Sequence, residues 1–129
     1  MTSSEKAIRV LVVEDDPVAA DAHVLYVGRV PGFVAVGKAH SGAEARRALE
    51  RTPVDLLLLD LHLPDVPGEE VLRELRADAR TAAIPVVVIS ADATGAAIAR
   101  LRNAGADDYL TKPLDLEEFL STVERYLPH

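Results

Sequence analysis

The sequence predicts a single α/β domain in which a parallel five-stranded sheet is covered by helices on both faces. Two observations carry this prediction. Short apolar runs rich in β-branched residues alternate with segments of helical periodicity, five of each, and such alternation is typical of parallel strands joined by right-handed crossovers. Unusual polar residues also follow four of these runs, at the strand ends where open α/β sheets place their sites.

The first strand is expected at Ile8 to Val13, a continuous apolar run. The pair Asp16-Pro17 then favours a helix start, because Asp is a good N-cap and Pro suits the first helical position. We predict that this helix covers 17–30 and stops at Pro31-Gly32. Phe33 to Ala39 predicts a second, less apolar strand.

The middle of the chain repeats this pattern. Ser41 and Glu44 have the spacing of a capping box, which predicts a helix ending near Arg51. Val54 to Leu59 is the most hydrophobic run and is therefore expected in the middle of the sheet. Asp65 to Gly68 predicts a turn that leads into a helix through Ala77.

The last third supplies two more strands and two helices. Pro85 to Ser90 is the expected fourth strand, and an alanine-rich helix over 95–104 should stop at Gly105. Asp108 to Thr111 predicts a short fifth strand. A final helix is expected over 115–127, with Asp115 as its cap.

Length and composition restrict the function classes. A chain of 129 residues is enough for one core, with the domain expected over 8–129 and a flexible N-terminus over 1–7. Cysteine is absent, which excludes disulfides and cysteine-based zinc sites, and no apolar stretch approaches the roughly 20 residues that span a bilayer. The net charge of −7 disfavours direct binding to nucleic acid or anionic lipid. We therefore expect a cytoplasmic protein without a nucleic-acid or membrane partner.

The polar residues at the strand ends indicate one site. Glu14 and Asp15 follow the first strand, Asp60 the third and Lys112 the fifth, while Ser90 ends the fourth. Clustered carboxylates repel one another unless a cation compensates, and a few oxygen ligands with water suit Mg²⁺. A carboxylate beside a metal, a lysine and a hydroxyl has what phosphoryl transfer requires. The expected product is an aspartyl phosphate.

At these residues the chain resembles the receiver domain of bacterial two-component response regulators. The resemblance runs from Ile8 to Leu127 and lies in the segments VVEDD, LLLDLHLPDVPG, VVVISA and DDYLTKPLDLEEF. It implies the flavodoxin-like (βα)5 fold of the chemotaxis receiver, with strand order 2-1-3-4-5. It also implies a phosphoacceptor in a phosphorelay, which catalyses only its own phosphorylation and dephosphorylation and is otherwise no enzyme.

The resemblance also assigns roles to single residues. Asp60 is the implied phosphoacceptor; Asp15 and Asp60 would bind Mg²⁺ directly, Glu14 through water, and His62 with its backbone carbonyl. Ser90 would donate its hydroxyl to the phosphoryl group, and Lys112, before an expected cis bond to Pro113, would pair with it. Tyr109 would change rotamer on phosphorylation, and the side chains of His62 and Asp92 would affect hydrolysis.

The implied partners are a histidine kinase or histidine phosphotransfer domain and a downstream protein or fused output domain. The apolar stripe Val18, Ala22 and Leu25 on the first helix is the expected docking surface for the phosphohistidine protein. The fourth helix, fifth strand and fifth helix would form the face that switches, which could also support a homodimer. The sequence leaves open whether the chain is a stand-alone protein or an excised domain.

Other assignments compete with these. A degenerate receiver would act as a constitutive interaction module, and a haloacid-dehalogenase-type phosphatase would want a second acid where His62 stands. A nucleotide-binding module would need a glycine-rich loop after the first strand. We interpret Asp16 as a helix cap, and His23, His40 and His129 as ordinary surface or helix residues. Arg46, Arg47, Arg100 and Arg102 are expected on solvated helix faces.

Overall fold

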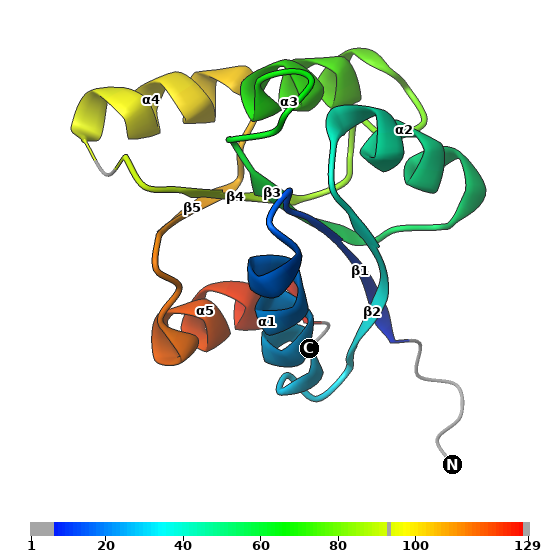
Figure 1. Ribbon diagram of the computed structural model, residues 1–129, viewed down its shortest axis with the longest axis vertical. Helices are drawn as coiled ribbons and strands as arrows, with labels where there is room; N and C mark the ends of the chain where they lie inside the picture. The colour runs from blue at the N-terminus through cyan, green and yellow to red at the C-terminus, as the bar shows by residue number, and fades with distance from the viewer. Residues whose placement is uncertain (1–6, 93, 128–129) are drawn as a thin grey trace.

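Parallel strands form the centre of the protein, in the order β2-β1-β3-β4-β5 (Figure 1). The computed structural model describes residues 7–92 and 94–127. Within them the strands are β1 (Ile8–Val13), β2 (Phe33–Ala39), β3 (Leu56–Asp60), β4 (Val86–Ser90) and β5 (Asp108–Thr111). The predicted sheet and its strand order are therefore confirmed. Residues 1–6 of the predicted flexible N-terminus, and His129, lie outside the described residues.

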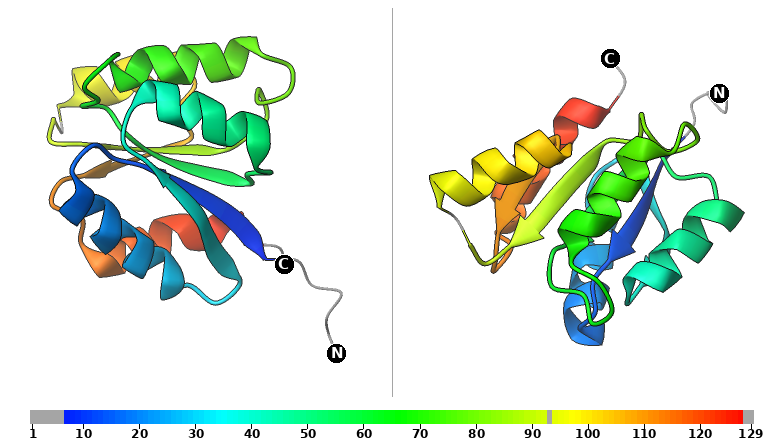
Figure 2. Two further views of the ribbon diagram at one scale, coloured as in Figure 1. Left: turned by 45° about the vertical axis from the view of Figure 1, so that its right-hand side comes forward. Right: turned by 90° about the horizontal axis from the view of Figure 1, so that it is seen from above.

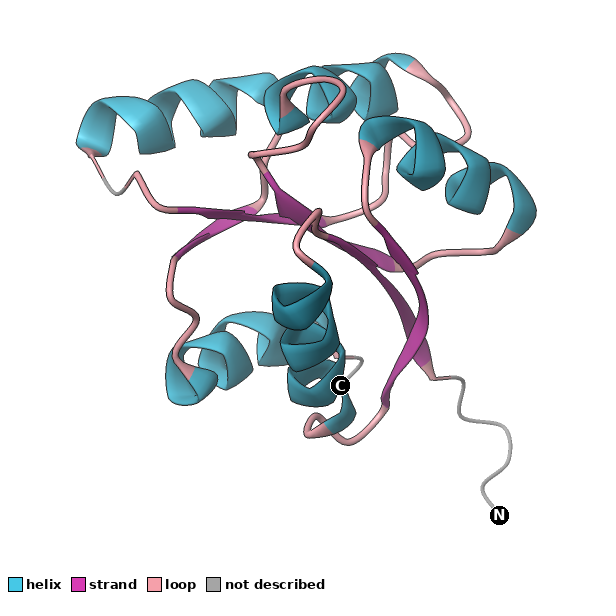
Figure 3. Cartoon of the chain, in the orientation of Figure 1, coloured by secondary structure: helices cyan, strands magenta, loops and turns pink. Residues whose placement is uncertain are grey.

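Helices cover both faces of this sheet, as predicted. They are α1 (Pro17–Gly28), α2 (Gly42–Arg51), α3 (Gly68–Ala77), α4 (Gly95–Ala104) and α5 (Leu116–Val123), which runs into the short 3₁₀ helix η1 (Glu124–Tyr126). α1 and α5 lie on one face, and α2, α3 and α4 lie on the other (Figures 1 and 2). The loops that join strands to helices are drawn pink in Figure 3.

The two layers of helices explain why the strands are apolar without alternation. Val10, Val12 and Leu58 belong to the core shared with α1 and α5. Their sequence neighbours Leu11 and Leu57 point to the opposite face and belong to the core under α2, α3 and α4. Because both faces of the central strands are covered, every residue of β3 and β4 is buried, and each buried Leu or Val stabilises the fold by about 1.5–3 kcal/mol.

Side-chain caps fix where the helices begin, which in turn fixes the loops of the site. Asp16 accepts the amide of Val18 at 3.2 Å and begins α1, as expected. Ser41, Thr94 and Asp115 cap α2, α4 and α5 in the same way. The predicted stop at Gly105 is also confirmed, with a left-handed backbone at φ 116° that favours glycine.

Four element boundaries differ from the sequence prediction, one of them at β4, which begins at Val86 rather than Pro85. α1 ends at Gly28 rather than at position 30, because the amides of Arg29 and Val30 bond to carbonyls three residues back and tighten the last turn. β3 begins at Leu56 instead of Val54. α5 ends at Val123, after which the chain narrows into η1. None of these changes moves a strand end at the site.

No helix within the described residues is long and apolar enough to cross a bilayer.

Candidate functional site

The carboxyl ends of β1, β3, β4 and β5 bring the predicted site residues together. Asp60 is the last residue of β3 and Ser90 the last of β4, and Asp60 pairs in register with Ile89. The amide of Lys112 bonds to the carbonyl of Ser90 at 2.9 Å, which places the residue after β5 beside the end of β4. Because neighbouring parallel strands end at the same edge of the sheet, residues from separate sequence motifs lie together in one site.

The acidic cluster consists of Glu14, Asp15 and Asp60, whose carboxylate oxygens lie within 4.8 Å of one another. Glu14 and Asp60 are 1% and 0% exposed, whereas Asp15 is exposed to solvent. Two buried carboxylates at this distance need compensating charge. Because Asp15 is exposed, the cluster is accessible from solvent on the side of this residue, and an ion can reach it there.

Lys112 supplies part of that charge. Its Nζ lies 2.9 Å from Asp60 Oδ2 and 3.4 Å from Glu14 Oε1. The other oxygen of Asp60, Oδ1, accepts the amide of His62 at 3.0 Å. Both oxygens of the predicted phosphoacceptor thus accept hydrogen bonds, one from the loop that follows β3 and one from the residue after β5.

The two buried carboxyls have opposite pKa shifts. Burial, together with the neighbouring Asp60, raises the pKa of Glu14 to about 7. Burial alone would raise the pKa of Asp60 too, but hydrogen bonds from Glu14, the His62 amide and Lys112 lower it below its usual value. Asp60 is therefore the ionised carboxylate, which is the form a nucleophile requires.

The donor set of the cluster fits Mg²⁺. All three side chains offer oxygen, the ligand type that this hard ion prefers, and few protein ligands suffice because water completes the octahedron. Among the described residues, Glu14 Oε1 is a buried oxygen without a hydrogen-bond partner. This oxygen can therefore still accept a hydrogen bond, for example from a water bound to a metal ion. A divalent cation would relieve the repulsion between these carboxylates. The predicted role of the His62 backbone carbonyl stays a prediction.

Ser90 and Tyr109, the predicted switch residues, lie on the neighbouring strands β4 and β5. Ser90 is buried, and its Oγ accepts the amide of Asp92 at 3.1 Å, so it does not cap α4. Tyr109 is half-buried against the core under α2, α3 and α4, and its hydroxyl has no hydrogen-bond partner among the described residues. The bond between Lys112 and Pro113 is cis, as expected. The switching role of Tyr109 remains a prediction.

His23 lies in helix α1, as one part of the expectation allowed, but it is not a surface residue. His23 is only 6% exposed, and its Nδ1 lies 3.9 Å from Glu14 Oε1. Burial lowers its pKa. His40 also contacts this segment, since its Nδ1 lies 2.9 Å from the backbone oxygen of Glu14. Its spacing from Ala20 and Val27, the other buried residues of α1, is the one sequence signal for this burial, and apolar residues on the other faces of the helix obscure it.

The other described residues that the sequence predicts at the surface are exposed in the structure. Val18 and Leu25 are 77% and 71% exposed, so the predicted apolar stripe on α1 faces solvent. His62 is exposed at the rim of the site. The four arginines Arg46, Arg47, Arg100 and Arg102 are exposed on their helices, and two of them pair with glutamates of α3.

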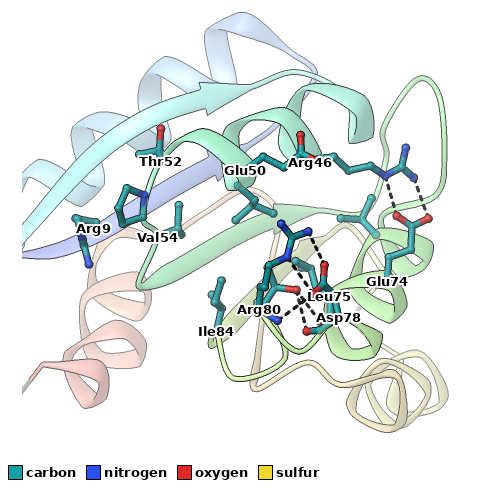
Figure 4. A pocket seen from close by; sticks show the side chains of 14 residues that line it. Arg9, Arg46, Glu50, Thr52, Val54, Glu74, Leu75, Asp78, Arg80 and Ile84 are labelled. Carbon is teal, nitrogen blue, oxygen red and sulfur yellow. Dashed lines mark hydrogen bonds and ion pairs between the residues drawn. The ribbon is translucent and has the colours of Figure 1, made fainter.

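A pocket of about 470 Å³ lies away from the acidic cluster, between α2 and α3 and the loops that precede β3 and β4 (Figure 4). Apolar side chains such as Leu75 and Ile84 form its floor. Arg46 pairs with Glu74 on its rim, and Arg80 pairs with Asp78. None of the predicted site residues lines it. A shallower hollow, lined by residues that include Asp15 and His62, lies at the site itself.

The sequence model of the response regulator receiver domain family matches residues 10–124 of this chain. The chain belongs to this family. Among curated relatives, the receiver domain is 39% identical over 119 residues to the transcriptional regulatory protein MalR of Bacillus subtilis, covering 92% of this chain and 50% of MalR. It is also 39% identical over 114 residues to KdpE of Mycobacterium tuberculosis, covering 88% and 48%. The chain thus spans about half the length of these relatives.

Solved structures show the same fold for the receiver domain. A response regulator receiver protein from Pseudomonas putida superimposes with a TM-score of 0.82 at 33% identity, covering 92% of this chain and 97% of the other. A putative response regulator from Chloroflexus aurantiacus gives a TM-score of 0.85 at 28% identity, covering 94% and 98%. The chain is therefore a signalling receiver domain of two-component systems, as its motifs predicted.

The comparisons run against one expectation about partners. A further relative, 38% identical over 121 residues, is named a DNA-binding dual master transcriptional regulator, RpaA of Synechocystis, and the receiver domain covers 48% of it. Nucleic acid therefore takes part in the function of such a relative. The prediction of no nucleic-acid partner rested on the net charge of this chain. The charge of one domain does not determine whether another domain of a longer protein binds DNA.

Proposed function

We propose that this receiver domain takes a phosphoryl group from a phosphohistidine onto Asp60 in a Mg²⁺-dependent reaction. The observation that carries the proposal is the environment of Asp60. Its carboxylate is fully buried, ionised, held by Lys112 at 2.9 Å and grouped with Glu14 and Asp15. A structural carboxylate would need only a counter-ion, whereas this one also lies in a cluster that suits a metal.

The chemistry follows from these groups. An oxygen of Asp60 attacks phosphorus, the bond from phosphorus to the histidine nitrogen breaks, and the electron pair leaves with the imidazole. Bound Mg²⁺ would neutralise the charge that builds up on the phosphoryl oxygens. Asp15 and Asp60 would hold the ion directly and Glu14 through water. Lys112 is already within 2.9 Å of the acceptor, so it can pair with a phosphoryl oxygen as the new bond forms.

Signalling would follow from the charge added at Asp60, about −1.5 to −2. The hydroxyl of Ser90, which is buried at the end of β4, would bond to that charge. If Ser90 turns inward, Tyr109 can occupy the space beside it, and the face of α4, β5 and α5 changes. That face would contact a downstream protein, a fused output domain or a second copy of the chain.

The labelling experiment uses acetyl phosphate as a small phosphodonor. We expect one phosphoryl group per molecule of protein with Mg²⁺, and none with EDTA or in the Asp60→Asn variant. Beryllofluoride should bind under the same conditions. Sustained release of phosphate from many donor molecules would instead indicate a phosphatase, and no labelling with no beryllofluoride binding would indicate a degenerate interaction module.

The exposed stripe of Val18, Ala22 and Leu25 is the proposed docking surface for the phosphohistidine protein. Leu25 is 71% exposed, so its replacement should not disturb the core. We expect Leu25→Lys to slow phosphotransfer from a phosphorylated histidine phosphotransfer domain but not from acetyl phosphate, which needs no docking. Val34→Lys is the control, because Val34 is also an exposed apolar residue but lies on β2. Equal rates for both variants with the protein donor would remove this proposal.

A further inference from the structure

We propose that His23 of α1 is a positioning residue that holds the Glu14 carboxylate in the orientation required for the metal site. This inference rests on the proposed function and adds a residue to it. His23 takes no part in the acceptor chemistry itself. It would act only through Glu14, by offering the imidazole Nδ1 to the carboxylate oxygen Oε1.

The place of His23 in α1 is the first observation. The buried residues of this helix are Ala20, His23 and Val27, spaced three and four positions apart, so they form the stripe that packs on the sheet. Val27 and its neighbours in the core are apolar. An imidazole in such a stripe costs about 1–3 kcal/mol if its polar nitrogen stays unpaired. A Leu or Val would fill the same position without that cost.

The second observation is what the imidazole faces. Nδ1 of His23 lies 3.9 Å from Glu14 Oε1, and both atoms are buried without a hydrogen-bond partner among the described residues. A shift of about 1 Å would bring them to hydrogen-bond distance. Since buried polar atoms are normally hydrogen-bonded, two that both lack a hydrogen-bond partner and lie this close are best explained as partners of each other.

The other contacts of Glu14 show why a third donor matters. Oε2 accepts the amide of Asp16 at 3.2 Å, which fixes one side of the carboxylate. Oε1 lies 3.4 Å from Lys112 Nζ, but that amine is closer to Asp60. If Lys112 pairs with a phosphoryl group, Glu14 loses it in part. A donor from α1 would then keep Oε1 in place without drawing Lys112 away from Asp60.

Some residues do not bind the metal but hydrogen-bond to a metal ligand and orient it. Removing such a residue commonly weakens metal binding about 10- to 100-fold. We therefore expect His23→Leu to raise the Mg²⁺ dissociation constant by about tenfold. His23→Asn should restore it to within roughly threefold of the parent, because the Asn amide nitrogen occupies nearly the position of Nδ1 and donates a hydrogen bond.

The experiment titrates MgCl₂ into ¹⁵N-labelled protein and follows the backbone amides of the acidic cluster, with urea unfolding measured in parallel. Val27→Ala is the matched control: it removes buried volume from the same stripe, so it should lower stability while its dissociation constant stays within roughly twofold of the parent. Weakened binding in His23→Leu, rescue in His23→Asn and unchanged binding in Val27→Ala would support the role.

Two results would overturn the inference. His23→Leu could bind Mg²⁺ as tightly as the parent, or Val27→Ala or His23→Asn could lose as much affinity as His23→Leu, which would reveal a packing effect. Failure of the proposed function looks different, because the parent protein itself would then show no Mg²⁺-dependent shifts at Glu14, Asp15 and Asp60, and this inference would fall with it.

Discussion

At the scale of single residues, the site keeps two carboxyls inside the protein at a cost in stability. Glu14 and Asp60 are almost completely buried and share one lysine, so the metal-free cluster has more negative than positive charge. Burial is the main cause of the raised pKa of Glu14, whereas hydrogen bonds from Glu14, the His62 amide and Lys112 outweigh burial and lower the pKa of Asp60. Lys112 and the His62 amide favour the ionised form of Asp60. The repulsion between the two carboxylates then adds to the raised pKa of Glu14.

The raised pKa of Glu14 predicts a pH dependence. Its pKa is 4.5 in the unfolded chain and about 7 in the folded protein, so between these values the folded state binds more protons than the unfolded state. Ionisation of Glu14 therefore lowers the stability as the pH rises through this window. Asp60 contributes to the pH dependence of stability with the opposite sign. Its ionised form stabilises the folded state, and this stability is lost only as the pH decreases below 3.8, because the pKa of Asp60 is lowered from that value.

Glu14→Gln removes this titration and keeps the shape of the side chain. In EDTA, we expect the stability of the variant relative to the parent to increase between about pH 5 and 8, by on the order of 2 kcal/mol. Urea unfolding at both pH values measures the difference. The lowered pKa of His23 acts in both proteins, so the comparison separates it from Glu14. A constant difference across this range would show that Glu14 is not the titrating group.

The identity of the site residues could be read from the sequence, but the partner of Glu14 could not. Asp60, Ser90 and Lys112 stand at the ends of apolar runs, and parallel register brings such ends together whatever the helices do. His23 lies inside a helix with apolar residues on nearly every side. Whether it faces solvent or the sheet depends on the rotation of α1, which the mixed pattern of that helix does not determine.

At the scale of elements, the close approach of α3 to the end of β3 fixes the loop that carries His62. Gly68, the first residue of α3, donates its amide to the carbonyl of Leu61 at 3.0 Å. A Cβ at Gly68 would lie 2.7 Å from the backbone oxygen of Asp60 and 2.7 Å from Leu61 Cα. These are backbone atoms of Asp60 and of the residue that follows it, so they cannot move aside without moving Asp60.

We therefore expect Gly68→Ala to lower the free energy of unfolding by about 1–3 kcal/mol, although alanine is the better helix former. Gly95→Ala is the matched control, since Gly95 is the first residue of α4 and a Cβ there would meet nothing within 4 Å. That variant should be neutral or slightly stabilising. Urea unfolding of both proteins measures the contrast, and a harmless Gly68→Ala would mean that α3 can shift away from β3.

The ends of the elements were harder to predict than their existence. The capping signals at Asp16, Ser41 and Asp115 are local, and the structure confirms them. The start of β3 depends on a long-range contact instead. Arg9 donates both its amide and its side chain to the Asp55 carboxylate, and the Asp55 amide donates to the Arg9 carbonyl at 2.8 Å, so the residue before Leu56 is held by β1. Such a contact across the sheet leaves no pattern in the sequence near Val54.

At the scale of the whole molecule, metal binding and folding should be linked. An ion that binds only the folded cluster stabilises the protein by RT ln(1 + [Mg²⁺]/Kd), about 1.4 kcal/mol at roughly ten times Kd. For a domain of this size, that corresponds to a rise in Tm of about 4–7 °C. We expect this rise in the parent protein, measured by thermal unfolding with MgCl₂ against EDTA.

Asp15→Asn should abolish the Mg²⁺-dependent rise, because it removes one charged oxygen ligand from the cluster. Glu117→Gln removes an equal charge from the exposed first turn of α5 and should keep the rise, which separates binding at the site from general screening of the net charge of −7. Equal increments in the two variants would place the ion elsewhere on the surface.

The central claim, that Asp60 is the phosphoacceptor, is tested most directly by locating the phosphoryl group. The protein is phosphorylated with acetyl phosphate and Mg²⁺, reduced with borohydride to convert an aspartyl phosphate into homoserine, and mapped by peptide mass spectrometry. We predict homoserine at position 60 alone, and none when Mg²⁺ is withheld. Conversion at Asp15, at another carboxylate or at no position would contradict the account.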